Sequence, residues 1–391
     1  MGRRAKGFGA VTLSIIFFLI GVIAGFGVIT YVKLPLTDSV TSSEEVYYYK
    51  DGALLESGSV ELADADISIH FLELGNKYTG DCTYIKTKDA DILIDCGSKT
   101  SSISTVSNYL NNYVTDGILE YVIVTHAHQD HYAGFATSTK IQSIFDLYEC
   151  KNIIDFGNSS NQKDTATTYK NYLRERQDEI DAGAMHYTAI DCIENERVFT
   201  LDAEKNISFK VLNNEYNKYD RNDASTNAFK ADTENDYSVC TLFTYGTHNY
   251  LFTGDLEEEG EHKLIANNAL PRVDLYKAGH HGSKTSSSAE LMRVIQPKTV
   301  CVCCCAGSSE YTKTNANQFP TQKFIDNVSI YTDKIYVTTL CVDYDKDLFE
   351  SLNGNIVFLS KNDTYEIKCS NNDTILKETA WFKANRTWNG I

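Results

Sequence analysis

Short apolar runs alternate with longer amphipathic stretches along most of the chain, and this order predicts a mixed α/β fold. The run 121–125 is continuous, apolar and β-branched, which is typical of a strand buried on both faces. Residues 103–114 and 167–180 show the apolar spacing of amphipathic helices. Further runs predict strands at 67–74, 82–86, 91–95, 207–212, 237–245, 250–253, 273–276, 299–305, 335–340 and 355–360. No linker-like segment interrupts this alternation, so we expect one α/β domain over residues 66–391.

The first apolar stretch of the chain differs from the short strand-like runs, because it is long enough to cross a bilayer. Residues 7–32 carry no charge, and about 20 apolar residues span the hydrocarbon core. The residues before this stretch include the basic side chains of Arg3, Arg4 and Lys6. Since basic residues stay on the cytoplasmic side, we expect residues 1–33 to form a cytoplasmic tip and a single transmembrane signal anchor in the plasma membrane. Residues 34–65 would then form a stalk with a first strand, and the large domain would be extracytoplasmic. A cleaved signal peptide is the alternative, although its apolar core would be shorter.

The net charge of the chain limits the classes of binding partner that we expect. There are 36 basic and 53 acidic residues, and four of the basic ones flank the apolar stretch. The remainder therefore carries 32 basic against 53 acidic residues, a net charge of −21. A surface this acidic repels nucleic acid, so we do not expect a dedicated nucleic-acid-binding protein. No segment indicates a dedicated protein partner either.

Histidines and an aspartate cluster directly after the buried run 121–125. His126, His128, Asp130 and His131 lie within six residues, although the chain has only 9 histidines. Imidazole and carboxylate groups suit zinc, iron and manganese. Because a strand end can aim several of these side chains into one cleft, the cluster indicates a metal site.

Two later segments place similar residues at predicted strand ends. Asp255 follows the run 250–253 after a glycine, and His280 and His281 follow the run 273–276 in a glycine-rich loop. A Gly-Asp pair alone is an ordinary turn. Together with the first cluster, the two segments favour one shared site.

These segments resemble the metallo-β-lactamase superfamily, and within it the hydrolase domain of ComEC-type DNA-uptake proteins. Two further matching pieces are Gly80-Asp81 and the run 93–97, which contains Asp95. The resemblance covers about residues 67–360 and implies an αββα four-layer sandwich with metal ions at one edge of the paired sheets. Only one spanning segment is expected here, so transport of DNA is not implied.

The resemblance also implies a centre of two divalent ions, with zinc the first choice and manganese the second. The implied ligands are His126 and His128 for the first ion, Asp130, His131 and His281 for the second, and Asp255 as the bridge. His280 would face the substrate, and Asp95 would support the metal-binding loop. Many relatives carry a further metal-binding histidine before the Gly-Asp carboxylate, where this chain has residues 234–238 without one. Asp236, Asn235 or water could take its place.

A pair of such ions can hold a bridging hydroxide as the nucleophile at neutral pH. Asp130 or Asp255 could orient that hydroxide. The side chains predicted to meet a phosphate are His280, Ser283, Lys277 and Lys284. We therefore expect a phosphodiesterase or nuclease-like hydrolase acting on a small phosphoester or a nucleic acid. The alternatives are a small-ester hydrolase, of the phosphorylcholine-esterase or lactonase kind, and a non-catalytic metal-stabilised binding module.

Overall fold

A computed structural model describes most of the chain. The described residues are 45–50, 53–58, 65–138, 141–156, 166–362 and 364–391. The predicted transmembrane segment at residues 7–32 lies outside them. Across the described residues, no helix combines the length and the apolar character needed to cross a membrane. Where the sequence predicted a stalk with one strand, β1 (Glu45–Lys50) and β2 (Ala53–Gly58) pair as a small antiparallel sheet.

Two eight-stranded sheets form the body of the domain. Sheet I contains, in order across the sheet, β18 (Thr364–Cys369), β17 (Ile356–Lys361), β3 (Ile67–Phe71), β4 (Thr83–Thr87), β5 (Asp91–Ile94), β6 (Ile118–Val124), β7 (Glu149–Asp155) and β8 (Met185–Thr188). Sheet II contains β16 (Leu348–Ser351), β15 (Ile335–Asp343), β14 (Thr299–Ala306), β13 (Leu275–Lys277), β12 (His248–Phe252), β11 (Cys240–Tyr245), β10 (Ile207–Leu212) and β9 (Val198–Asp202). An early and a late strand of the chain thus meet in sheet I, because β17 pairs with β3.

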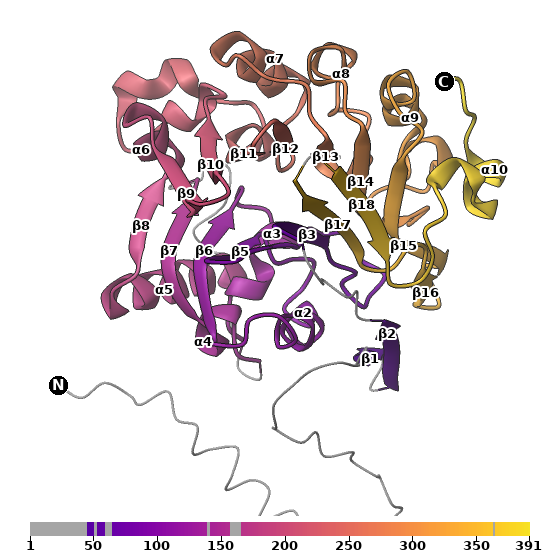
Figure 1. Ribbon diagram of the computed structural model, residues 1–391, viewed down its shortest axis with the longest axis horizontal. Helices are drawn as coiled ribbons and strands as arrows, with labels where there is room; N and C mark the ends of the chain where they lie inside the picture. Colours follow the sequence, from indigo (N-terminus) through magenta and orange to yellow (C-terminus); the bar gives the residue numbers. More distant parts are fainter. Residues whose placement is uncertain (1–44, 51–52, 59–64, 139–140, 157–165, 363) are drawn as a thin grey trace, which may run out of the picture. The chain divides into compact units, whose positions relative to one another are not determined.

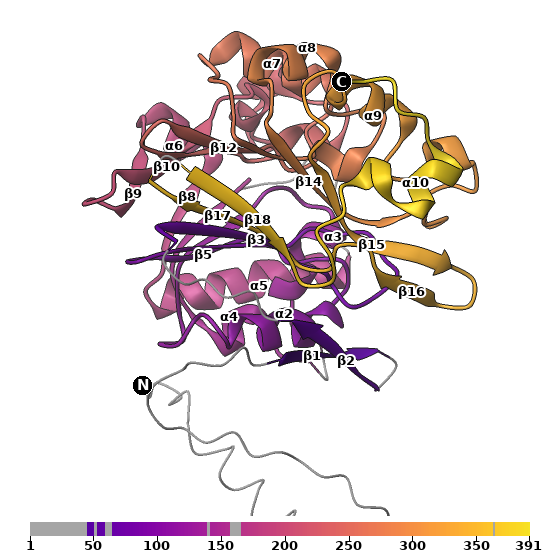
Figure 2. The same cartoon turned by 45° about the vertical axis from the view of Figure 1, so that its right-hand side comes forward.

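Helices cover the outer faces of both sheets, and Figure 2 shows the resulting four layers. The helices beside sheet I are α2 (Ser102–Leu110), α3 (Gln129–Tyr132), α4 (Ile144–Leu147) and α5 (Thr167–Ala182). Those beside sheet II are α7 (Glu258–Asn267), α8 (Ala289–Ile295), α9 (Gln322–Val328) and α10 (Ala380–Asn385). The short helix α6 (Ala189–Glu194) joins β8 to β9 and so links the two sheets. This arrangement agrees with the predicted four-layer sandwich.

Alternation along β12 explains why both faces of sheet II are apolar. Tyr250 and Phe252 belong to the core between the sheets, whereas Leu251 points to the other face and packs in the core under the helices. Rings from the two sheets meet directly, because the ring centroids of Phe71 and Phe252 are 6.2 Å apart and those of Tyr250 and Phe358 are 5.4 Å apart. Burial of such side chains stabilises the fold by roughly 1.5–3 kcal/mol each.

The parallel strands decide where functional side chains can gather. β5 to β8 run parallel in sheet I, and β12 to β15 run parallel in sheet II (Figure 1). Ligands in α/β sheets bind beyond the carboxyl ends of parallel strands. The loops after β5, β6, β12 and β13 carry Asp95, the 126–131 cluster, Asp255 and the pair His280 and His281.

Candidate metal centre

The loop after β6 is held by Asp95, which follows β5. Asp95 has a left-handed backbone, with φ of 56°, and its carboxylate accepts hydrogen bonds from the Thr125 backbone N–H and hydroxyl at 2.7 Å each. The same carboxylate binds His131 Nδ1 at 2.7 Å. Burial raises the pKa of Asp95, although the neighbouring His131 opposes that effect. Asp95 therefore supports the histidine loop, as the resemblance implied.

Two glycines allow the loops to approach this closely. A Cβ on Gly97 would lie 1.7 Å from the carbonyl oxygen of Asp130, so no larger residue fits there. Gly254 has a φ of +55°, and a Cβ there would lie 2.8 Å from Ser238 Oγ. This turn brings Asp255 to the loop after β6.

His131 and His281 face the same carboxylate oxygen. The Nε2 atoms of His131 and His281 are 3.2 and 3.3 Å from Asp255 Oδ2. The opposite nitrogen of each ring is also held. His131 Nδ1 bonds the Asp95 carboxylate, and His281 Nδ1 donates to the Cys303 carbonyl at 2.9 Å. Both Nε2 atoms are buried, and neither makes a hydrogen bond within the described residues.

These orphaned nitrogens suit a metal ion better than any protein partner. Asp81, His131, Asp255 and His281 can each offer one ligand atom, and these atoms all lie within 4.8 Å of one another. Asp130 Oδ2 adds a further oxygen 3.5 Å from His281 Nε2. Neutral imidazole and carboxylate are common ligands of divalent transition metals. The residues therefore fit a divalent cation.

Burial and charge act in opposite directions within this group. Burial disfavours the charged forms, but Asp255 and its neighbouring carboxylates raise the pKa of His131 and of His281 well above the usual value. In the same way, burial opposes ionisation of Asp255, yet the surrounding histidines hold its pKa well below the usual range. Cation binding must then displace protons from the two imidazoles.

His126 and His128 lie beside this group. His126 Nε2 is 3.0 Å from His128 Nδ1, and the ring centroids of His126 and His131 are 4.1 Å apart. Burial lowers the pKa of both His126 and His128, so both are neutral near pH 7. The structure thus brings the three predicted segments together at one corner of the two sheets.

The four residues predicted to meet substrate lie in three different places. His280 lines a cavity of about 420 Å³, the site cavity, whose lining residues are His128, Gln129, Asp130, Tyr132, Ala166, Thr168, Asp255, His280 and Tyr311. His280 Nε2 is 3.9 Å from Asp255 Oδ2, and its Nδ1 is 3.1 Å from Thr285 Oγ1 and 3.4 Å from Glu257 Oε1.

Lys277 and Ser283 lie deeper than predicted for substrate-binding residues. Lys277 is only 3% exposed, and its ammonium pairs with Asp81. It lines neither the site cavity nor the second cavity, which is described below. Ser283 is buried with its hydroxyl 3.1 Å from Thr285 Oγ1. Their roles toward substrate remain predictions.

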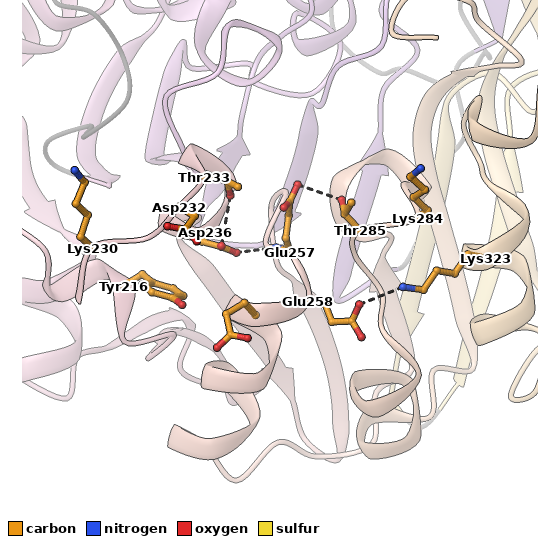
Figure 3. Close-up of a pocket in the computed structure, with 11 residues that line it drawn as sticks. Tyr216, Lys230, Asp232, Thr233, Asp236, Glu257, Glu258, Lys284, Thr285 and Lys323 are labelled. Carbon is orange, nitrogen blue, oxygen red and sulfur yellow. Dashed lines mark hydrogen bonds and ion pairs between the residues drawn. The ribbon is translucent and has the colours of Figure 1, made fainter. Parts of the chain in front are cut away.

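Asp236 and Lys284 line a second cavity of about 570 Å³, shown in Figure 3. Asp236 Oδ1 accepts a hydrogen bond from the Glu257 backbone N–H at 3.1 Å, and burial raises the pKa of Asp236 to about 6. Its carboxylate is not part of the four-residue metal group, so its predicted role as a ligand stays a prediction. Lys284 is exposed, and its Nζ lies 3.4 Å from Asn317 Oδ1. Glu257 and Thr285 separate the two cavities, since both line the second one and contact His280.

Sequence reasoning did not assign a role to Asp81, Tyr311 or Glu257. Asp81 Oδ1 lies 3.1 Å from His281 Nδ1, and the Gly80-Asp81 pair in the sequence was its only signal. The Tyr311 hydroxyl donates to Asp130 Oδ2 at 3.0 Å, across a sequence separation of 181 residues. No motif in the sequence marks this tyrosine.

Comparison with known proteins agrees with the geometry. Residues 75–143 match the family model of the metallo-beta-lactamase superfamily. The resemblance to this superfamily is therefore confirmed. The chain is 26% identical to ComE operon protein 3 of Bacillus subtilis over 224 residues, which are 56% of this chain and 23% of that protein. It is also 38% identical over 64 residues to Recombination protein 2 of Haemophilus influenzae, covering 16% of this chain and 8% of that protein.

The matched part of the chain thus spans less than a quarter of either relative. Among solved structures, the metallo-beta-lactamase fold protein YhfI from Bacillus subtilis is similar at a TM-score of 0.38 and 12% identity, over 70% of this chain and 96% of that one. The sequence matches, and not this structural likeness, carry the resemblance to the ComEC-type proteins.

Proposed function

We propose that the chain is a metal-dependent hydrolase of phosphodiesters. The observation that supports this best is the pair of buried Nε2 atoms, on His131 and His281, within 3.3 Å of one Asp255 oxygen. A buried arrangement of this kind costs free energy unless a further group satisfies it, and a divalent cation does so.

We assign two divalent ions to the centre, with zinc as the first choice and manganese as the second. The residues that would hold them are His126, His128, Asp130, His131, Asp255 and His281. The chemistry that such ions supply when bound is the acidification of water, which provides a hydroxide nucleophile at neutral pH.

The side chains around the site cavity supply positioning and proton transfer. Asp130 and Asp255 both line the cavity, and their ionised carboxylates can orient the attacking water. Glu257 and Thr285 hold the Nδ1 side of His280, so that its Nε2 lies toward Asp255 and can exchange a proton with the leaving oxygen.

The test uses the purified full-length chain with bis-p-nitrophenyl phosphate and added zinc or manganese. We expect turnover that depends on metal and falls to background in the His126→Ala, His128→Ala double variant. A Tyr331→Phe variant is the matched control, because Tyr331 precedes β15, at the end of sheet II away from the centre. Equal rates in the double variant and the wild type would contradict the proposal.

A small-ester hydrolase is the second candidate, and the dimensions of the site favour it over long nucleic acid. The cavity of about 420 Å³ is near the lower end for small-molecule pockets, and the chain beyond its N-terminal segment carries a net charge of −21. Turnover of a choline phosphoester or a lactone without turnover of the diester would select this candidate. One bound ion without any turnover would instead select a binding module that has lost catalysis.

We also propose that residues 7–32 anchor the protein in the plasma membrane with the hydrolase domain outside the cytoplasm. The support is the uncharged apolar stretch and the basic residues before it. Cell fractionation with external protease treatment of intact cells tests this. If external protease removes the domain from the membrane fraction, the proposal is supported. If the domain is fully protected from protease, the proposal is contradicted.

A further inference from the structure

Tyr311 reaches the metal centre from a loop that follows β14. Its hydroxyl donates to Asp130 Oδ2 at 3.0 Å, yet 58% of the residue remains exposed. It lines the site cavity together with Asp130, Asp255 and His280. A neutral hydroxyl that is fixed on a predicted metal ligand therefore faces the space where substrate would bind.

The loop that carries Tyr311, residues 307–321, is fastened along its length. Its two ends are joined by a hydrogen bond from the Gly307 N–H to the Phe319 carbonyl at 2.8 Å. The carboxylate of Glu310, next to Tyr311, accepts from the Thr79 N–H at 2.9 Å. The Arg386 guanidinium donates to the backbone carbonyls of Asn315, Gln318 and Pro320. Such anchoring is expected of a loop that must hold one side chain in place.

Aromatic packing connects this loop to the metal centre itself. The Tyr311 ring packs on Phe319 with centroids 5.6 Å apart. The Phe319 ring in turn lies 5.9 Å from that of His280 and 6.0 Å from that of His281. The position of the Tyr311 hydroxyl is therefore set by the same residues that surround the predicted ligand His281.

We propose that Tyr311 contacts the substrate and donates a hydrogen bond from its hydroxyl to a phosphoryl oxygen in the site cavity. This inference rests on the proposed phosphodiester hydrolysis. Rotation about the C–O bond turns the Tyr311 hydrogen away from Asp130 while the hydroxyl oxygen stays in place. A carboxylate that ligates a metal has less need of this second donor, so the hydrogen bond to Asp130 can be given up. A group bound beside Asp130 then lies within reach of the same O–H, which is a donor to any anionic oxygen.

The experiment compares Tyr311→Phe with Tyr331→Phe in the full-length, metal-loaded protein. Loss of one hydrogen bond to a charged oxygen should lower kcat/KM for bis-p-nitrophenyl phosphate about 10- to 100-fold in Tyr311→Phe, and hardly at all in the control. Binding of inorganic phosphate, measured by calorimetry, should weaken by a similar factor. Metal content, measured by mass spectrometry, should stay at the wild-type value.

Each outcome decides the inference separately from the proposed function. Wild-type values of kcat/KM and phosphate binding in Tyr311→Phe would overturn it while an active wild type upholds the hydrolase. If the wild type lacks turnover, the hydrolase proposal fails, and weaker phosphate binding in Tyr311→Phe still supports the contact. Loss of metal with unchanged activity per bound ion would assign Tyr311 to holding Asp130 and overturn the substrate contact. A wild type that neither turns over nor binds phosphate overturns both.

Discussion

The two histidine pairs of the centre differ in how the protein holds them. In the inner pair, His131 and His281, each Nδ1 bonds an oxygen acceptor, and each Nε2 faces Asp255. In the outer pair, His126 and His128, the rings contact one another at 3.0 Å. Neither outer ring bonds a carboxylate among the residues that the structure describes. His126 Nδ1 does lie 3.2 Å from the Thr125 hydroxyl, so the outer pair is held by a hydroxyl and the inner pair by a carboxylate and a backbone carbonyl.

The two histidine pairs also differ in the pKa values of their rings. Burial opposes charge in both pairs, but the carboxylates around the inner pair overcome it and raise the pKa of both rings. At the outer pair burial dominates and lowers the pKa. Because imidazoles held by oxygen acceptors bind metal more tightly, we expect the ion at the inner pair to bind more tightly than the ion at the outer pair.

The largest effect should come from the residue that both pairs would share. Asp255→Asn should remove most binding of both ions and lower activity more than about 100-fold, beyond the roughly 10- to 100-fold typical of residues that only support ligands. Metal analysis and kinetics measure this. Asp274→Asn is the control, since Asp274 is also buried but bonds Lys298 and the Asn249 N–H away from the centre. Two ions retained in Asp255→Asn would show that the pairs have no common ligand.

A smaller and one-sided effect should follow from the carboxylate that supports the inner pair. Asp95→Asn should weaken the ion at the inner pair about 10- to 100-fold, because His131 then loses its carboxylate partner. His128→Ala should weaken only the ion at the outer pair. Competition titration with a chromophoric chelator resolves the two affinities. Equal loss at both ions in both variants would contradict the distinction between the pairs.

The pH dependence should be the mildest distinction. The raised pKa values of His131 and His281 mean that metal must displace protons there, so affinity for the ion at the inner pair should rise with pH, about tenfold per unit for each proton displaced. The lowered pKa values of His126 and His128 leave these rings neutral, so affinity for the ion at the outer pair should stay flat between about pH 7 and 8. Calorimetry in buffers of different ionisation enthalpy counts the protons. Release of the same number at both steps would be inconsistent with this picture.

The strands that could be predicted from the sequence are those with a clear run or alternation of apolar residues. The run at 207–212 matches β10, and the runs near β6, β12 and β14 were placed within a few residues. No separate strand was predicted for β16 and β18, because half-exposed edge strands have mixed patterns that resemble loops.

The candidate site divides in the same way. The cluster 126–131 could be predicted because its members are neighbours in the chain. Asp81 and Tyr311 could not be, since only the folded chain brings them to His281 and Asp130. For Asp236, the sequence allowed a role as a ligand, but the hydrogen bond that its carboxylate accepts from the Glu257 backbone N–H, just before α7, depends on tertiary structure.

The hydrogen bonds from Arg386 to the 307–321 loop have a consequence for truncated versions of the protein. Arg386 comes just after α10, close to the last residue of the printed sequence, yet it braces the segment that presents Tyr311 to the cavity. A truncation before this arginine would leave both sheets intact in sequence and still loosen one wall of the substrate space. A purification tag placed after residue 391 therefore needs a spacer, so that the hydrogen bonds between Arg386 and the 307–321 loop are preserved.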